Sequence, residues 1–265
     1  MSRSDKSTSV TTLKRLGTSA NSWGVSKGMV SLVRLPSDAF IIEVPAHPQR
    51  LEIDLMRSAL LIVDMQNDFC SSGGWLSSIG VDTEPLRTII EPIRMISEQL
   101  RSLRVPIIWL NWGNRPDQAN LPPGVLHVYN PDGESVGIGD ELPGSGSRVL
   151  ESGSWSAGPV SGLDPYSGDI LVEKYRMSGF HDTPLDSILR NLGVTTLIFG
   201  GVNVDQCVFA TLIDAASLGY DVVLLSDCSA TTSPDFCVQS TYYNVAQCFG
   251  FVASSDSVIT ACNEV

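Results

Sequence analysis

Three residues of this chain have the types that covalent attack on a carbonyl carbon requires: Cys207, Asp64 and Lys174. A cysteine can act as the nucleophile, a carboxylate can take the thiol proton, and an ammonium can steady the charges that develop. Cys207 follows the glycine-rich turn GGVNVDQ, where it would open a helix. The N–H groups at a helix N-terminus lower a thiol pKa and can hold an oxyanion. Each residue also has an ordinary interpretation, as a small buried side chain, a capping or salt-bridged carboxylate, or a solvated lysine.

The hydrophobic pattern predicts that strands position these three residues. Short apolar runs at 58–64, 169–173 and 195–200 are typical of buried parallel strands. Further strands are predicted at 105–110, 220–226 and 249–253, and helices at 85–103, 185–191, 205–218 and 234–248. Alternating strands and helices indicate an α/β fold, a doubly wound and mainly parallel sheet with helices on both faces. Because ligands bind at the carboxyl ends of such strands, we expect Asp64, Lys174 and Cys207 to lie near one another.

The chain divides into an arm and a domain. We expect residues 1–48 to form a polar, extended N-terminal arm, with the apolar runs at 29–35 and 40–44 as candidate contacts between subunits. We expect residues 49–265 to form one α/β domain, of a size that is ordinary for a hydrolase. A long segment at 111–165, rich in Gly, Pro, Asn and Ser, interrupts the pattern; such segments usually line or cover a site.

The composition excludes several classes of partner. Asp and Glu number 29 against 17 Lys and Arg, a formal charge of −12, which disfavours nucleic acid and anionic membrane surfaces. The apolar runs are far shorter than the ~20 residues of a membrane span. None of the six cysteines forms a Cys-x-x-Cys pair, so we expect a cytoplasmic protein with reduced thiols. The three histidines, His47, His127 and His181, lack ligand spacing, and no metal or other cofactor is expected.

Three segments resemble the isochorismatase-like cysteine hydrolase superfamily: LLIVDMQNDF, VEKYRMSGFHDTPLDSILRNLGV and TLIFGGVNVDQCVFATLIDAASLGYDVVLLSDC. The resemblance covers about residue 50 to residue 260. It implies a three-layer domain with a six-stranded parallel sheet and a catalytic Asp64–Lys174–Cys207 triad. It also implies a cis peptide between Val202 and Asn203, an oxyanion hole formed by the N–H groups of Asn203 and Cys207, and assembly into homodimers or homotetramers.

The branch of the superfamily decides the expected reaction. Nicotinamidases of the family carry metal-binding histidines after the second strand, which this chain lacks, and isochorismatases proper do not need the cysteine. The closest similarity is to the ureide branch. It implies a cysteine-dependent amidohydrolase that cleaves a C–N bond of a small neutral ureide of the biuret or triuret type, releasing ammonia through an acyl-cysteine. Alternatives are a ureidoacrylate-type amidohydrolase, which RMSGF and TPLDSILR resemble, an N-carbamoyl amidohydrolase, or a degenerate oligomer that binds a small amide.

Four further residues are predicted to contact the substrate. Phe69 would form an apolar wall, and the amides of Asn111 and Gln247 would pair with a urea-like edge. Arg176 would add another contact. The competing interpretation is ordinary loop or helix polarity for Asn111 and Gln247, and a clamp on loop carbonyls for Arg176.

Overall fold

The computed structural model describes residues 13–34 and 38–264, which include a six-stranded, wholly parallel sheet. Its spatial order is β11-β10-β9-β6-β7-β8. The strands are β6 (Ser58–Val63), β7 (Ile107–Trp112), β8 (Ile170–Lys174), β9 (Thr196–Gly201), β10 (Asp221–Ser229) and β11 (Phe251–Ala253). From β6 the chain adds β7 and then β8 toward one edge of the sheet. It then returns to the centre, where β9 pairs with the other side of β6 and begins the second half. The strand order therefore reverses between β6 and β9, and such a switch point opens a crevice at the carboxyl ends of the strands.

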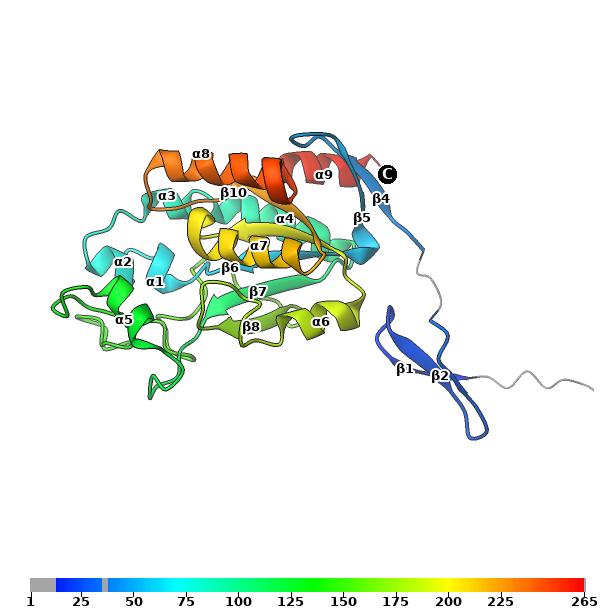
Figure 1. The fold of residues 1–265 in the computed structure, drawn as a ribbon, viewed down its shortest axis with the longest axis horizontal. Coiled ribbons are helices and arrows are strands. Elements are labelled where there is room, and N and C mark those ends of the chain that lie inside the picture. Colours follow the sequence, from blue (N-terminus) through cyan, green and yellow to red (C-terminus); the bar gives the residue numbers. More distant parts are fainter. Residues whose placement is uncertain (1–12, 35–37, 265) are drawn as a thin grey trace, which may run out of the picture.

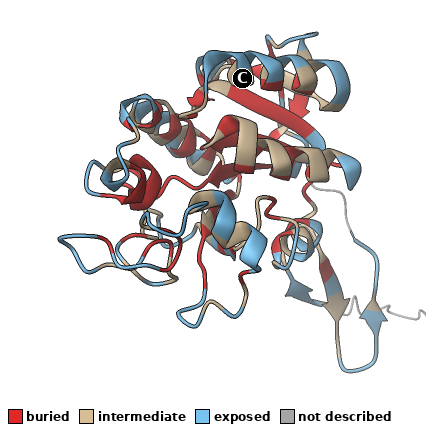
Figure 2. Cartoon of the chain, turned by 60° about the vertical axis from the view of Figure 1, so that its left-hand side comes forward, coloured by how far each residue is buried: buried red, intermediate tan, exposed pale blue. Residues whose placement is uncertain are grey.

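Helices cover both faces of the sheet, as the sequence pattern predicts (Figure 1). On one face lie α3 (Glu84–Arg87), α4 (Ile90–Ser102) and α9 (Ser255–Asn263), whose apolar residues join Trp109 and Ile198 in one core cluster. On the other lie α6 (Leu185–Leu192), α7 (Phe209–Ser217) and α8 (Asp235–Asn244). Figure 2 shows that burial concentrates on the strands and on the inner sides of these helices. The doubly wound α/β prediction is confirmed.

Two helical stretches differ from a plain α-helix. A π-helical turn, η2 (Val204–Val208), carries Cys207 and leads into α7, and a second one, η3 (Val245–Phe249), follows α8. The 85–103 segment, expected as one helix, is divided into α3 and α4. The remaining short helical elements are η1 (Leu55–Arg57), α1 (Asn67–Cys70), α2 (Trp75–Ser78) and α5 (Pro123–Tyr129).

The N-terminal region has two parts. Strands β1 (Lys14–Gly17), β2 (Ser22–Val25) and β3 (Val30–Ser31) form a small antiparallel sheet beside α6, at the edge of the molecule in Figure 1. Strand β4 (Ile41–Val44) pairs instead with β5 (Leu51–Asp54). Ile42 and Val44 are buried in the core cluster that contains α9, so burial of these two side chains joins residues 41–48 to the α/β domain rather than to the arm. No helix among the described residues is long and apolar enough to cross a membrane.

Buried polar residues after β6 anchor the 111–165 segment at the carboxyl edge of the sheet. The Gln66 amide donates to the carbonyl oxygens of Trp112 and Ala157 at 2.8 and 2.7 Å, and its oxygen accepts from the Trp112 N–H at 2.8 Å. The Asp68 carboxylate accepts from the N–H groups of Trp75 and Leu150 at 3.1 and 2.7 Å. The 111–165 segment, which includes α5, thus packs on the edge of the sheet at which Asp64 lies.

Candidate active site

Asp64 and Lys174 form a buried ion pair at the carboxyl edge of the sheet. The Lys174 Nζ lies 2.8 Å from the Asp64 Oδ2, and the side chains are 0% and 1% exposed. Their strands, β6 and β8, are not neighbours, because β7 runs between them. The ammonium also donates to the carbonyl oxygen of Arg176 at 3.2 Å and lies 4.7 Å from the centre of the Trp112 ring. A buried charge is tolerated only when it is paired in this way.

Lys174 keeps its proton in this buried position. Burial by itself lowers the pKa of Lys174, but the charges of Asp64 and Cys207 outweigh it, and the pKa lies above its ordinary value. Asp64 adopts φ 51°, a left-handed conformation in which Asp is enriched among non-glycine residues. Its own N–H donates to the carbonyl oxygen of Leu110 at 2.9 Å, which continues the pairing of β6 with β7 by one residue. The carboxylate therefore has a fixed direction and a fixed partner.

Cys207 lies at the end of the neighbouring strand β9, on the turn η2, and faces both members of the pair. It is 5% exposed. The pKa of the thiol is raised to about 12: burial raises it most, Lys174 opposes the rise, and Asp64 adds to it. The expectation that the helix N-terminus would lower this pKa is not met, because desolvation disfavours the thiolate more strongly than nearby positive charge favours it. The resting nucleophile is a thiol, so its attack requires a base beside it, and Asp64 occupies that place.

The backbone N–H groups of Asn203 and Cys207 are the predicted donors to a substrate oxygen. The Val202–Asn203 peptide is cis, as the family resemblance implies. The Val204 N–H donates to the carbonyl oxygen of Ala230. The N–H groups of Gln206 and Val208 both donate to the carbonyl oxygen of Asn203. Within the described part of the chain, no backbone hydrogen bond joins the N–H groups of Asn203 and Cys207 to a carbonyl oxygen outside η2. Their role as an oxyanion hole stays a prediction.

Two residues that the sequence analysis did not select, Met177 and Tyr129, lie beside the nucleophile. The Met177 Sδ is 3.6 Å from the Cys207 Sγ and 3.6 Å from the Tyr129 hydroxyl. Burial raises the pKa of Tyr129, and the charges of Cys207 and Asp64 raise it further, so the hydroxyl faces the reacting groups as a neutral donor. Tyr129 comes from α5, in the 111–165 segment, and no spacing rule connects it with residue 207.

A groove of about 570 Å³ opens outside Met177. It is lined by Val128 and Tyr129 of α5, by Met177, and by Asp205, Gln206, Phe209, Ala210 and Ile213 of η2 and α7. Because Met177 and Tyr129 line this groove and also contact each other beside Cys207, they separate the solvent side from the thiol. Among these lining residues, all of them described, Asp205 carries the single carboxylate and there is no Arg or Lys.

Phe69 and Arg176 lie near the site in different roles. The Phe69 ring packs 6.5 Å from Trp75, which in turn contacts Tyr129 edge-on at 5.4 Å, so the three rings form a continuous apolar wall. The Arg176 guanidinium donates to the carbonyl oxygens of Asn120 and Tyr175 at 2.8 and 3.0 Å and pairs with Asp182 at 3.3 Å. This is the clamp on loop carbonyls that the sequence analysis held as the alternative.

The structure does not bring Asn111 and Gln247 to the triad. Asn111 pairs in register with Glu173, whereas Lys174 is the next residue and points to the opposite face. Asn111 instead lines a separate cavity of about 260 Å³ with Trp109 and Glu173. Gln247 is exposed on η3, directly before β11 begins, and thus lies at the amino edge of the parallel sheet. Cys207 follows the carboxyl end of β9, at the other edge.

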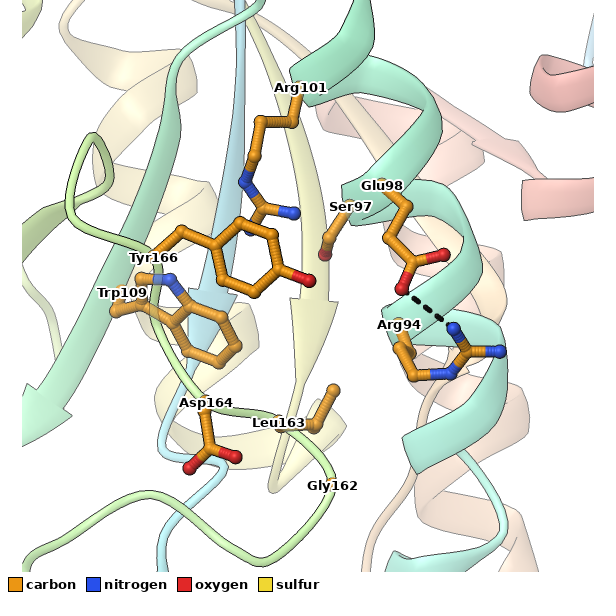
Figure 3. Close-up of a pocket in the computed structure, with 9 residues that line it drawn as sticks. All are labelled: Arg94, Ser97, Glu98, Arg101, Trp109, Gly162, Leu163, Asp164 and Tyr166. Carbon is orange, nitrogen blue, oxygen red and sulfur yellow. Dashed lines mark hydrogen bonds and ion pairs between the residues drawn. The ribbon is translucent and has the colours of Figure 1, made fainter.

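A smaller cavity of about 120 Å³ lies between α4 and residues 162–166 (Figure 3). Its basic groups are already paired: Arg101 with Asp169 at 2.8 Å, and Arg94 with Glu98 at 2.6 Å. Arg101 also lies 4.1 Å from the centre of the Tyr166 ring. We interpret this cavity as a packing feature. Among the described residues, no group of three or more His, Cys, Asp or Glu side chains could hold a metal ion.

Comparisons with known proteins agree with this geometry. A model of the isochorismatase domain matches residues 58–257. The chain is 34% identical over 219 residues to the ureidoacrylate amidohydrolase RutB of Klebsiella pneumoniae, covering 82% of this chain and 92% of that protein. It is 33% identical over 238 residues to RutB of Pseudomonas syringae pv. syringae, covering 89% and 96%.

Solved structures give the same answer. A cysteine hydrolase of Pseudomonas syringae pv. phaseolicola superposes with a TM-score of 0.68 and 26% identity, covering 86% of this chain and 99% of that one. N-carbamoylsarcosine amidase of Thermoplasma acidophilum superposes with a TM-score of 0.58 and 25% identity, covering 76% and 97%. The family predicted from the sequence motifs is therefore confirmed: this chain is a member of the isochorismatase family of hydrolases.

Proposed function

We propose that this protein is a cysteine amidohydrolase that cleaves a C–N bond of a ureidoacrylate-type ureide. The observation that carries the proposal is the buried Asp64–Lys174 ion pair facing the Cys207 thiol, a base and a nucleophile excluded from water. The relatives named above, with a third of their residues identical over most of the chain, favour the ureidoacrylate class over the biuret and triuret class expected from the sequence.

The reaction follows from the positions of the three groups. Asp64 takes the thiol proton while the Cys207 sulfur forms a bond to the carbonyl carbon of the ureide. The carbonyl oxygen becomes an oxyanion and accepts hydrogen bonds from the N–H groups of Asn203 and Cys207. The C–N bond then breaks, and Asp64 returns the proton to the departing nitrogen. Water then attacks the carbonyl carbon of the acyl-cysteine while Asp64 takes its proton; the C–S bond breaks, and Asp64 returns the proton to the sulfur, which restores the thiol.

Lys174 acts in each step by keeping its charge. Its ammonium pairs with the Asp64 carboxylate and orients it, and it faces the sulfur as negative charge develops there. Without Lys174, a carboxylate that is 1% exposed would be buried with no charged partner, which is strongly unfavourable.

A neutral ureide of the biuret type is the second candidate. The groove beside Met177 carries the Asp205 carboxylate and no basic side chain among the residues that line it. A negative wall disfavours a substrate with its own carboxylate. The Asp205 carboxylate therefore favours an uncharged ureide over the ureidoacrylate-type acid that the relatives favour.

One experiment tests both candidates. Loss of substrate and release of ammonia are measured for a ureidoacrylate-type acid, biuret, triuret, an N-carbamoyl amino acid and nicotinamide. Cys207→Ser should abolish turnover, whereas Cys70→Ser, a matched change of another buried cysteine near Asp64, should leave it intact. The highest kcat/KM for the acid supports the first candidate, and the highest value for biuret or triuret supports the second. Full activity of the Cys207 variant would overturn the mechanism for both.

A further inference from the structure

The small sheet β1–β3 exposes apolar side chains on a surface with almost no core of its own. Of residues 13–34, all of which the structure describes, Ser22 is the single buried one. The pairing register puts Leu16 beside Trp23 and Val25 beside Val30, so these four side chains share one face with Lys14. Leu16, Trp23 and Val30 are 64%, 42% and 52% exposed.

The opposite face is also open. Leu13, Arg15, Gly24 and Val33 line a groove of about 480 Å³ there. Contacts to the domain come from the turn between β1 and β2, where the Thr18 hydroxyl donates to the carbonyl oxygen of Asn191 at 3.0 Å. A sheet of three short strands is stable in water when an apolar face is covered, and contiguous exposed apolar patches mark interaction sites.

The charge of the sheet differs from that of the domain. Residues 13–34 hold four basic residues, Lys14, Arg15, Lys27 and Arg34, and no acidic one. After residue 37 the chain holds 28 Asp and Glu against 11 Lys and Arg. Two copies of the basic sheet repel each other, whereas the sheet of one copy and the acidic domain of another attract.

We propose that the β1–β3 sheet is a docking arm whose partner is the acidic α/β domain of a second copy of this chain. Apolar faces supply the contact area, and the four basic residues select the acidic surface over another arm. The inference is independent of the proposed reaction, because no residue of the arm belongs to the triad.

The lysines of this chain allow a direct test. They number four, at positions 6, 14, 27 and 174, and Lys174 is fully buried, so every accessible lysine lies before residue 28. Copies labelled with ¹⁵N and unlabelled copies of the full chain are mixed and treated with a carbodiimide, which joins an amine to a carboxylate. Mass spectrometry should find peptides that join Lys14 or Lys27 of one isotope to an Asp or Glu after residue 37 of the other.

Two pairs of variants separate the arm from general charge. Lys14→Glu with Lys27→Glu should weaken association by at least about tenfold in sedimentation. Arg50→Glu with Arg104→Glu applies the same change in charge to exposed positions of the domain and should leave association intact. Trp23→Ser with Val30→Ser should dissociate the copies even at high salt, with the domain still folded by near-ultraviolet circular dichroism.

Three results would overturn the inference. One is a monomer at every concentration tested. Another is a set of cross-links confined to single chains, which would show that the arm folds onto its own domain. The third is a monomer that sediments with vesicles containing phosphatidylserine, which would assign the arm to a membrane surface.

Discussion

The Met177 Sδ lies 3.6 Å from the Cys207 Sγ, on the side of the thiol that faces the groove. A methionine has three rotatable bonds and can change rotamer at low energetic cost. In its present rotamer Met177 shields the Cys207 thiol from solvent, and a change of rotamer would open access to the thiol. The resting structure is closed at this point, and a substrate that enters by the groove must displace the thioether.

Replacing Met177 with alanine should expose Cys207 to small electrophiles. We expect alkylation of Cys207 by iodoacetamide to become at least several times faster, because the thioether that covers the sulfur is gone. The rate is measured by peptide mass spectrometry at one pH. Met177→Leu keeps the volume and serves as the control. Equal rates for the alanine variant and the wild type would show that Met177 does not restrict access.

The pKa of Cys207 predicts an alkaline reactivity profile. Burial raises it from an ordinary value of 9.0 to about 12, so the folded state holds the proton more tightly than the unfolded state. Stabilisation by the neutral thiol is thus fully present below about pH 9 and is lost as pH rises toward 12. In the wild type, alkylation of Cys207 without substrate should keep increasing from pH 8 to 11. A plateau near pH 7 would indicate a resting thiolate.

The Asp64–Lys174 pair should respond to single and double changes differently. Lys174→Met leaves a buried carboxylate without its partner, which typically costs about 3–5 kcal/mol of unfolding free energy. Asp64→Asn with Lys174→Met removes both charges and should regain most of that stability while remaining inactive. Urea unfolding measures the first quantity and ammonia release the second. A double variant as unstable as Lys174→Met would mean that packing, rather than the unpaired charge, determines the loss.

Tyr129→Phe should reduce turnover while the fold is kept. The change removes the hydroxyl that faces Met177, Cys207 and Asp64 and leaves the ring against Trp75. The hydroxyl donates to the neutral Met177 sulfur, and loss of such a hydrogen bond costs about 0.5–1.5 kcal/mol, so we expect kcat/KM to fall by about two- to tenfold. Tyr166→Phe, in the separate cavity beside Arg101, is the matched control. An unchanged kcat/KM for Tyr129→Phe would limit this residue to packing.

Much of the fold could be predicted from the sequence, because its signals are local. The apolar runs ending at Asp64 and before Lys174 have the composition of buried parallel strands, and β6 and β8 lie there. The arm boundary at residue 48 could not be predicted in this way. The alternation in β4 is short, and Ile42 and Val44 are buried by tertiary packing in the core cluster that also contains residues of α9.

For the site, the sequence by itself determined which residue types stand at the carboxyl ends of the strands. In any parallel sheet those ends meet at one edge, which is why Asp64, Lys174 and Cys207 could be grouped without coordinates. Tertiary structure decided the rest. It placed Tyr129 and Met177 beside the thiol, put Asn111 on the other face of the sheet and Gln247 at the other edge, and raised the thiol pKa instead of lowering it. Each of these outcomes depends on how distant segments pack and on how that packing excludes water. The spacing of neighbouring residues in the sequence specifies neither the packing nor the exclusion of water.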